Sequence, residues 1–191
     1  MAWRWVSPIS LVTVLIAITL ACLRGGYAQE TQASLTLGAP FKLVDQTGAT
    51  VTDETYRGKW MVMYFGFTHC PDVCPTTLSK ISNMMDLLGR AADRVQPLFI
   101  TVDPQRDTVE VMRDYVAAID KRLIGLTGPA DAIAALAKGY GIISNRSGNG
   151  TDYTIGHSAG VYLVDPEGRY STTLDPNLSA RDMAAWLSAL M

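Results

Sequence analysis

The spacing of apolar residues changes along the chain, and each change marks the start of a predicted element. The segment Trp60–Phe67 is apolar at nearly every position, which predicts a strand buried on both faces. From Cys74 to Gly89 the apolar residues recur every three or four positions, and this period predicts an amphipathic helix. Val95–Val102 is again apolar and predicts a second central strand. A strand therefore leads into a helix, and that helix leads back into a strand.

Weaker patterns complete the order of elements. Turn residues at 45–48 and 165–168 separate pairs of short runs and predict two β-hairpins, Phe41–Val44 with Ala49–Thr52 and Val161–Val164 with Tyr170–Leu174. A short strand and three helices remain: Leu123–Leu126, Val109–Ile119, Ile133–Tyr140 and a last helix that opens at Ser179. This order describes an α/β fold, a thioredoxin-like sandwich in which helices flank a central mixed sheet, with an N-terminal β-hairpin.

Two segments near the C-terminus carry finer expectations. Ser179 and Asp182 have the spacing of a capping box, and the helix that they open is expected to bury four large side chains, those of Met183, Trp186, Leu187 and Leu190. Asn145–Gly150 is rich in serine, asparagine and glycine, so it is expected to be a flexible loop just ahead of His157.

The N-terminus has the composition of an export segment. Residues 1–28 contain no acidic residue, and the apolar run Ile9–Leu23 is shorter than the roughly 20 residues that a spanning helix needs. Three outcomes stay open: cleavage after Ala28, retention as a membrane anchor, or lipidation at Cys22. Each outcome places the rest of the chain in the periplasm, either anchored to the inner membrane or secreted.

The rest of the chain divides into a polar linker, residues 29–38, and one domain, residues 39–191, which is long enough for a single core. Without residues 1–28 the chain has 14 basic and 18 acidic residues, so its net charge near −4 excludes a basic footprint for nucleic acid. The exported part keeps only two cysteines and two histidines, which form a site or a single local clip rather than a disulfide scaffold.

The two remaining cysteines, Cys70 and Cys74, lie about one helical turn apart at the start of the first predicted helix. The helix N-terminus is expected to lower the pKa of Cys74 and favour its thiolate. Two thiolates on one side select soft metals, Cu(I) above all, and an imidazole can bind the same ion. The spacing also permits a disulfide, so metal binding, redox chemistry and an inert clip all stay open at this point.

His157 favours the metal. It precedes the predicted strand Val161–Val164, and in thioredoxin-like proteins the loop at this place faces the cysteine helix. Redox enzymes of that fold carry a cis-proline there, whereas this chain has no proline between Pro129 and Pro166. His69 is a weaker candidate, because a neighbour of Cys70 in an extended segment points away, and Asp72 is expected to hold the loop or cap the helix.

Three stretches together identify a family: FGFTHCPDVCP (65–75), TVDPQRDT (101–108) and YTIGHSAGVYLVDPEG (153–168). The chain resembles the Sco/SenC family of copper proteins, which assist assembly of the copper A centre of cytochrome c oxidase, over about residues 38–190. The resemblance implies copper ligands at Cys70, Cys74 and His157, with Cu(I) as the expected form and Cu(II) as an alternative. Many members have an acidic residue before the ligand histidine, where this chain has Gly156.

The segment TVDPQRDT also has a structural interpretation. It forms a loop between a strand and a helix, in which Asp107 or Thr108 caps the helix and Arg106 pairs with a carboxylate. A role for Asp103, Arg106 and Asp107 near the copper, or in docking a partner, is the alternative. Four methionines could suggest a second copper site, but their positions on a core strand and helix favour packing: Met61, Met63, Met84 and Met85.

The resemblance implies that the acceptor of the copper is subunit II of cytochrome c oxidase, and an upstream copper donor is a further expected partner. The N-terminal segment makes the membrane a third. Metal delivery, rather than an enzymatic reaction, is the favoured function. The alternative is a thiol-disulfide reductase that uses the same two cysteines on an exported partner protein, with a thiol peroxidase as a weaker third hypothesis.

Overall fold

The computed structural model describes residues 37–150, 152–158 and 160–191. The predicted export segment, residues 1–28, and most of the predicted linker, residues 29–38, lie outside this described part. Within it, no helix combines the length and the hydropathy that crossing a bilayer requires.

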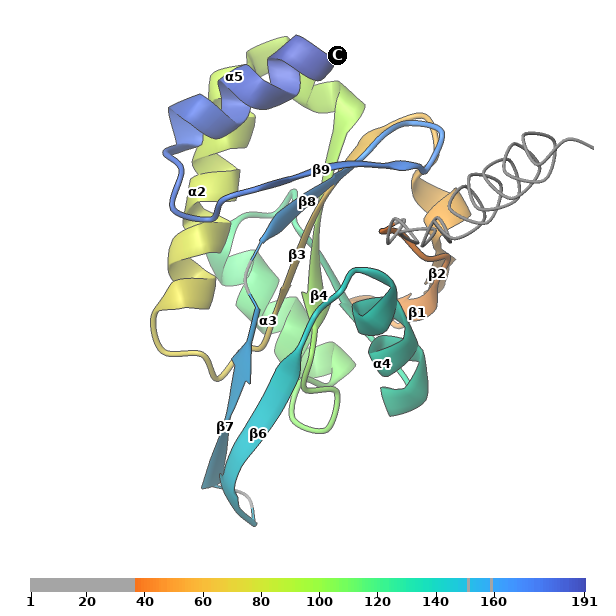
Figure 1. Cartoon of the computed structure of the whole chain (residues 1–191), viewed down its shortest axis with the longest axis vertical. Helices are drawn as coiled ribbons and strands as arrows, with labels where there is room; N and C mark the ends of the chain where they lie inside the picture. The colour runs from red at the N-terminus through yellow and green to blue at the C-terminus, as the bar shows by residue number, and fades with distance from the viewer. Residues whose placement is uncertain (1–36, 151, 159) are drawn as a thin grey trace, which may run out of the picture. The chain divides into compact units, whose positions relative to one another are not determined.

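The centre of the domain is a seven-stranded mixed sheet with the order β2-β1-β5-β4-β3-β8-β9 (Figure 1). Its strands are, in chain order, β1 Lys42–Asp45, β2 Thr50–Thr52, β3 Trp60–Gly66, β4 Val95–Thr101, β5 Ile124–Thr127, β8 Val161–Val164 and β9 Tyr170–Leu174. Strands β3, β4 and β5 run parallel, while both hairpins, β1–β2 and β8–β9, add antiparallel strands at the sides. The predicted strands and the α/β, thioredoxin-like sandwich are therefore confirmed.

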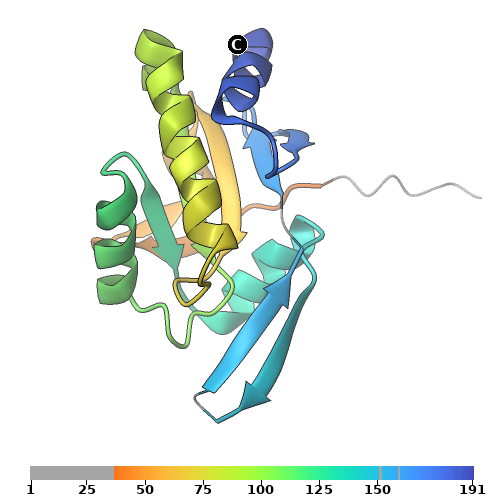
Figure 2. The same cartoon turned by 90° about the vertical axis from the view of Figure 1, so that its left-hand side faces the viewer.

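Helices cover both faces of this sheet (Figures 1 and 2). The α-helices are α2 Val73–Leu88, α3 Val109–Ile119, α4 Ala130–Gly139 and α5 Ala180–Leu190, and two short 3-10 helices are η1 Asp53–Tyr56 and η2 Gly89–Arg94. One apolar cluster joins α2, α3 and α5 to the sheet, and a second joins α4 and the N-terminal hairpin to the other face. Because β3 lies between the two clusters, its alternate side chains enter opposite cores, which explains why nearly all of its positions are apolar.

The topology collects three distant segments at one edge of the sheet. Gly66 and Thr101 are register partners at the carboxyl ends of β3 and β4, so the loops that follow these strands leave side by side. Strand β8 runs antiparallel to β3, with Val161 opposite Tyr64, and the residues that precede β8 therefore reach the same edge. The cysteine segment, the 103–107 loop and His157 meet there.

The expectation of a flexible loop at Asn145–Gly150 is wrong. The segment belongs to strand β6 (Ser144–Asn149), which pairs with β7 (Asp152–His157) as a separate two-stranded antiparallel ribbon. This ribbon projects from the cysteine edge of the sheet (Figure 2). Its polar composition hides the strand pattern, because no apolar face of the ribbon is buried in a core.

The start of α5 is as predicted, whereas its buried face is narrower. The hydroxyl of Ser179 accepts a hydrogen bond from the amide of Asp182, and Met183 and Leu187 are buried. Trp186 is 54% exposed and Leu190 is 39% exposed, so the expectation that both are buried is wrong. The helix packs on α2 through a stripe that excludes these two positions.

Candidate metal centre

Cys70 and Cys74 are both free thiols, and they lie at the mouth of α2. The Sγ atom of Cys70 accepts a hydrogen bond from the amide of Cys74 at 3.5 Å, so the sulfur of Cys70 sits against the helix N-terminus. The backbone amide of Cys70 in turn donates to the carbonyl oxygen of Phe67 at 3.2 Å, which curls the loop back toward β3. Cys70 is partly exposed, whereas Cys74 is buried.

Gly66 makes room for the buried sulfur. A side-chain carbon at this position would stand 2.8 Å from Sγ of Cys74 and 2.8 Å from the ring of Phe99. The absence of a side chain therefore lets the Cys74 sulfur lie directly against the end of β3. The hydroxyl of Tyr64 donates a weak hydrogen bond to the same sulfur at 3.9 Å.

Burial also reverses the expected acidity of this thiol. The Cys74 side chain is removed from water, and this desolvation raises its pKa to about 12. The expectation that the helix N-terminus lowers the pKa of Cys74 is therefore wrong. Desolvation has the largest influence on this thiol, and the backbone amide of Cys74 at the helix mouth is directed at the sulfur of Cys70.

His157 is the last residue of β7, and its imidazole approaches the cysteines. The Nε2 atom of His157 lies 4.0 Å from Sγ of Cys74. The Nδ1 atom lies 2.9 Å from the carbonyl oxygen of Ser158, and a carbonyl can only accept, so Nδ1 carries the proton. In the neutral imidazole the lone pair of Nε2 then faces the sulfur. The ring of Phe67 supports the imidazole edge-on, with the ring centroids 6.1 Å apart.

Gly156 precedes His157, and the outer partner of the imidazole is the carbonyl of Ser158 rather than a side chain at position 156. Side chains of successive strand residues point to opposite faces, so a carboxylate at position 156 would point away from the His157 imidazole. The carbonyl of Ser158 supplies the outer hydrogen bond that fixes the ring orientation.

The donor types suit a soft metal, and His157 lies near bonding separation from Cys74. Two thiols and an imidazole are ligands that Cu(I) accepts. With bonds of about 2.3 Å to sulfur and about 2.0 Å to nitrogen, a trigonal ion needs these two ligand atoms about 3.7 Å apart. The observed 4.0 Å is slightly longer. In agreement, the described residues hold no preassembled group of three metal-ligating side chains.

The two weaker candidates lie outside this group. The imidazole of His69 is about half exposed and faces Asp107, with Nδ1 3.9 Å from Oδ1 of Asp107 and 3.2 Å from the hydroxyl of Thr68. Asp72 is the N-cap residue of α2, but its carboxylate makes no capping bond to a backbone amide. It accepts instead from the hydroxyl of Thr76 at 3.3 Å, which holds the loop.

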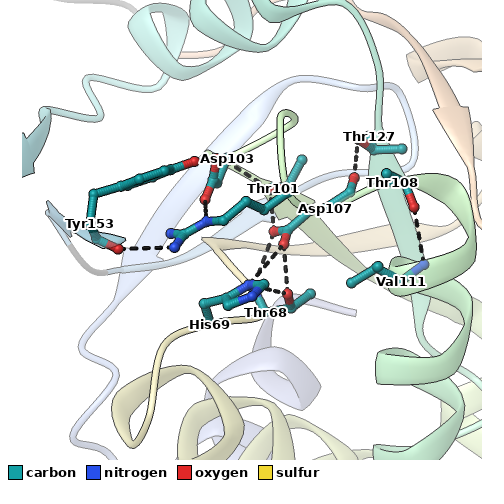
Figure 3. A network of polar contacts seen from close by, with 10 residues as sticks. Thr68, His69, Thr101, Asp103, Asp107, Thr108, Val111, Thr127 and Tyr153 are labelled. Carbon is teal, nitrogen blue, oxygen red and sulfur yellow. Dashed lines mark hydrogen bonds and ion pairs between the residues drawn. The ribbon is translucent and has the colours of Figure 1, made fainter. Parts of the chain in front are cut away.

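Asp107 ties the cysteine loop to the sheet (Figure 3). Its buried carboxylate accepts hydrogen bonds from the Thr68 amide at 3.1 Å, the Thr68 hydroxyl at 2.6 Å and the Thr101 hydroxyl at 2.6 Å. The hydroxyl of Thr127 donates to the Asp107 carbonyl oxygen at 2.7 Å. The alternative in which Asp107 caps α3 is wrong, because Thr108 is the cap: its hydroxyl accepts from the amide of Val111.

Asp103 and Arg106 connect the same loop to the ribbon. The side chain of Arg106 pairs with the Asp103 carboxylate, which confirms that Arg106 pairs with an acidic residue. The Tyr153 hydroxyl donates to Asp103 at 2.6 Å, and Arg106 donates to the Tyr153 carbonyl oxygen at 2.9 Å. Tyr153 is a residue for which the sequence pattern alone predicted no role. The alternation of Tyr153, Ile155 and His157 in the sequence is the signal that could have revealed it.

The four methionines that could have suggested another copper site are core residues. Each is at most 3% exposed and packs in one of the two apolar clusters: Met61, Met63, Met84 and Met85. The packing interpretation is confirmed.

Comparison with known proteins agrees with this arrangement. The SCO1/SenC family matches residues 29–191. The mitochondrial protein SCO2 of Saccharomyces cerevisiae is 37% identical over 154 residues, which are 78% of this chain and 51% of that protein. A SCO2-like protein of Rickettsia prowazekii is 38% identical over 150 residues, 77% of this chain and 73% of that protein. The chain thus spans about half the length of the yeast relative and about three quarters of the bacterial one.

A solved structure supports the same assignment. The structure of Bradyrhizobium japonicum ScoI with copper bound superposes with a TM-score of 0.76 and 39% sequence identity, over 81% of this chain and 99% of that one. The family match covers the whole domain and its two cysteines and histidine. The chain belongs to the SCO1/SenC family.

Proposed function

We propose that this chain is a copper-binding metallochaperone for cytochrome c oxidase assembly. Cys70, Cys74 and His157 hold the copper, and the acceptor is the copper A site of subunit II. The observation that carries the proposal is the 4.0 Å approach of His157 Nε2 to Cys74 Sγ, beside a Cys70 sulfur at the helix mouth. Copper bound to the related ScoI of Bradyrhizobium japonicum supports the choice of metal.

The geometry favours uptake and release of the metal rather than permanent binding. Cu(I) is the expected form, since two sulfurs and one imidazole suit a soft ion, and Cu(II) is the alternative. Three ligands at a partly exposed edge leave one side of the ion open to thiolates of a partner. Copper can then move by stepwise ligand exchange, in which each new bond forms as an old one breaks. The same exchange would load the site from an upstream copper donor.

Copper titration of three single variants tests the proposal: Cys70→Ser, Cys74→Ser and His157→Ala. Cu(I) affinity is measured on the purified full-length chain by competition with a chromophoric chelator. Each variant is expected to weaken binding, because each removes one ligand. His69→Ala is the control, since that imidazole faces Asp107 rather than the sulfurs. Wild-type affinity in all three ligand variants would refute the proposed site.

A second function is favoured by one observation: the two cysteines are reduced and share a hydrogen bond at the helix mouth. The dithiol could reduce a disulfide of an exported partner, with attack by one sulfur and resolution by the other. The partly exposed Cys70 is the attacking group in this case. Reductase activity would survive His157→Ala, whereas copper binding would weaken, so this variant separates the two functions.

The proposed location follows from the N-terminal sequence. Residues 1–28 direct the domain to the periplasm and either anchor it in the inner membrane or are removed. Fractionation of cells that produce the full-length chain, with and without an alkaline wash of the membranes, separates an anchored product from a secreted one.

A further inference from the structure

The ribbon that carries His157 has few means of holding its position. Among the residues that the structure describes, strands β6 and β7 pair only with each other, as a sheet separate from the central one. A hollow of about 290 Å³ lies beneath the ribbon, between it and α4, and Ile155 and Tyr153 are among its lining residues. Close packing against a core therefore does not fix the ribbon. Specific side-chain contacts must do so.

Besides the contact of Phe67 with His157 and a hydrogen bond of 3.4 Å from Arg146 to Gln105, these contacts involve Tyr153, four residues before His157. The Tyr153 hydroxyl donates a hydrogen bond to Asp103, whose side chain is only 3% exposed (Figure 3). The backbone carbonyl oxygen of Tyr153 accepts a hydrogen bond from Arg106. The guanidinium carbons of Arg106 and Arg146 lie 3.6 Å and 3.5 Å from the centroid of the Tyr153 ring. Two groups this close to one centroid would overlap on the same face, so the arginines cover opposite faces of the ring.

The opposite strand is adapted to this arrangement. Gly148 is the register partner of Tyr153, and its φ of +118° is a conformation that residues with side chains rarely adopt. A side-chain carbon at Gly148 would stand 2.8 Å from Cα of Tyr153. Arg146 also donates to the carbonyl oxygen of Gly150 at 2.6 Å, which closes the tip of the ribbon.

Resting on the proposed function, we propose that Tyr153 is a positioning residue for copper. Clasped between Arg106, Arg146 and Asp103, it holds the ribbon at the angle that brings His157 to the cysteines. Tyr153 and His157 share one face of β7, since they are four positions apart and side chains alternate between faces along a strand. The contacts that Tyr153 and His157 make with the rest of the domain therefore lie on the same side of the ribbon. Loss of the clasp lets the ribbon swing and withdraws the imidazole part of the time.

A double-mutant cycle tests this role. Tyr153→Phe removes the hydroxyl that bonds to Asp103 but keeps the ring, and His157→Ala removes the ligand itself. Affinity for Cu(I) is measured on the full-length chain by chelator competition. Tyr153→Phe is expected to weaken binding by about three- to tenfold, because the competent population falls when the bond to the buried carboxylate is lost. In the His157→Ala background the same change is expected to have no effect.

Two additions complete the test. Tyr170→Phe is the matched control, because its hydroxyl bonds to Thr173 at 2.9 Å on the β8–β9 hairpin, and it should match the wild type. With Cu(II) bound, the electron paramagnetic resonance spectrum of Tyr153→Phe should show a weaker hyperfine contribution from the imidazole nitrogen of His157 than the wild type does. Tyr153→Leu, which also loses the ring contacts, should weaken Cu(I) binding further.

The outcomes distinguish the two proposals. Equal weakening by Tyr153→Phe with and without His157 would overturn the positioning role, because the effect would not pass through the imidazole. Wild-type affinity of Tyr153→Phe, beside a weakened His157→Ala, would overturn it while leaving the copper site intact. Wild-type affinity of His157→Ala would overturn the positioning role and remove His157 from the proposed ligands, while Cys70→Ser and Cys74→Ser would still test the copper site itself.

Discussion

The Nε2 atom of His157 lies 4.0 Å from the Sγ atom of Cys74, although 83 positions separate the two residues in the sequence. The strand order creates this approach, because β8 runs antiparallel to β3 and returns the chain to the edge from which α2 departs. Several consequences of the surrounding structure can be measured.

Gly66→Ala should damage the proposed copper site, and Gly156→Ala should not. A methyl group at position 66 would stand 2.8 Å from the Cys74 sulfur and from Phe99, so overpacking is expected to cost about 1–3 kcal/mol and to weaken Cu(I) binding. Position 156 has its nearest neighbour at 4.0 Å, so a methyl group fits there beside the proposed ligand. Urea unfolding and chelator competition measure the two effects. Equal behaviour of the variants would contradict the packing described for Gly66.

Asp107→Ala should destabilise the fold by about 3 kcal/mol, because it leaves the buried donors of Thr68 and Thr101 without an acceptor. The loop before Cys70 would lose its tie to β4. Asp114→Ala is the matched control, since the Asp114 side chain is 83% exposed and should cost less than about 0.5 kcal/mol. Urea unfolding compares the two variants. A control as destabilising as Asp107→Ala would argue against a stabilising role for the hydrogen bonds that the Asp107 carboxylate accepts.

The ion pair of Asp120 with Arg122 should make stability fall in acid. Hydrogen bonds from Arg122, helped by Ser82, lower the pKa of Asp120 from 3.8 to about 2. A lowered folded-state pKa stabilises the protein above the unfolded value, and this contribution is lost as the pH falls from about 4 to about 2. Because Arg122 is about one third exposed, we expect about 1 kcal/mol.

Urea unfolding of the wild type and of Asp120→Asn, followed from pH 6 to pH 2, checks this contribution. The free-energy difference between the two proteins should shrink over the stated window as Asp120 becomes protonated. A difference that stays constant with pH would show that the carboxylate does not stabilise the fold through its charge.

Helix α5 offers a test of its buried stripe. Leu187 is fully buried against α2, so Leu187→Ala should destabilise the fold by about 3 kcal/mol. Trp186, its neighbour in sequence, is 54% exposed, and Trp186→Ala should cost less than about 1 kcal/mol. Thermal or urea unfolding compares them, and the reverse order of stability would mean that the helix is rotated.

The sequence was sufficient for the elements whose burial leaves a clear period. Strands β3 and β4 and helix α2 follow the predicted segments to within one residue or so, because each faces an apolar core. Where an element is only partly buried, the apolar period predicts more buried residues than the structure has. Trp186 continues the apolar pattern of α5, but the buried stripe of the helix consists of Met183, Ala184 and Leu187.

The ribbon leaves only a weak period, the alternation of Tyr153, Ile155 and His157, because even its inward face is only partly buried. A local signal was nevertheless present. Glycine is favoured in tight hairpin turns, and Gly150, directly after the last residue of β6, has a φ of +58°. The pKa of Cys74 depends on desolvation by residues far away in sequence, so helix position alone gave the wrong direction.

The unequal burial of the two sulfurs gives the site a direction. The Cys74 sulfur is closed off by β3 and Tyr64, while the Cys70 sulfur remains in reach of water. Any reagent that arrives from solution, whether an alkylating agent or an incoming thiol, meets Cys70 first. The site is therefore accessible from one side, through the Cys70 sulfur. The Cys74 sulfur becomes accessible only after a rearrangement, or to an ion that enters past Cys70.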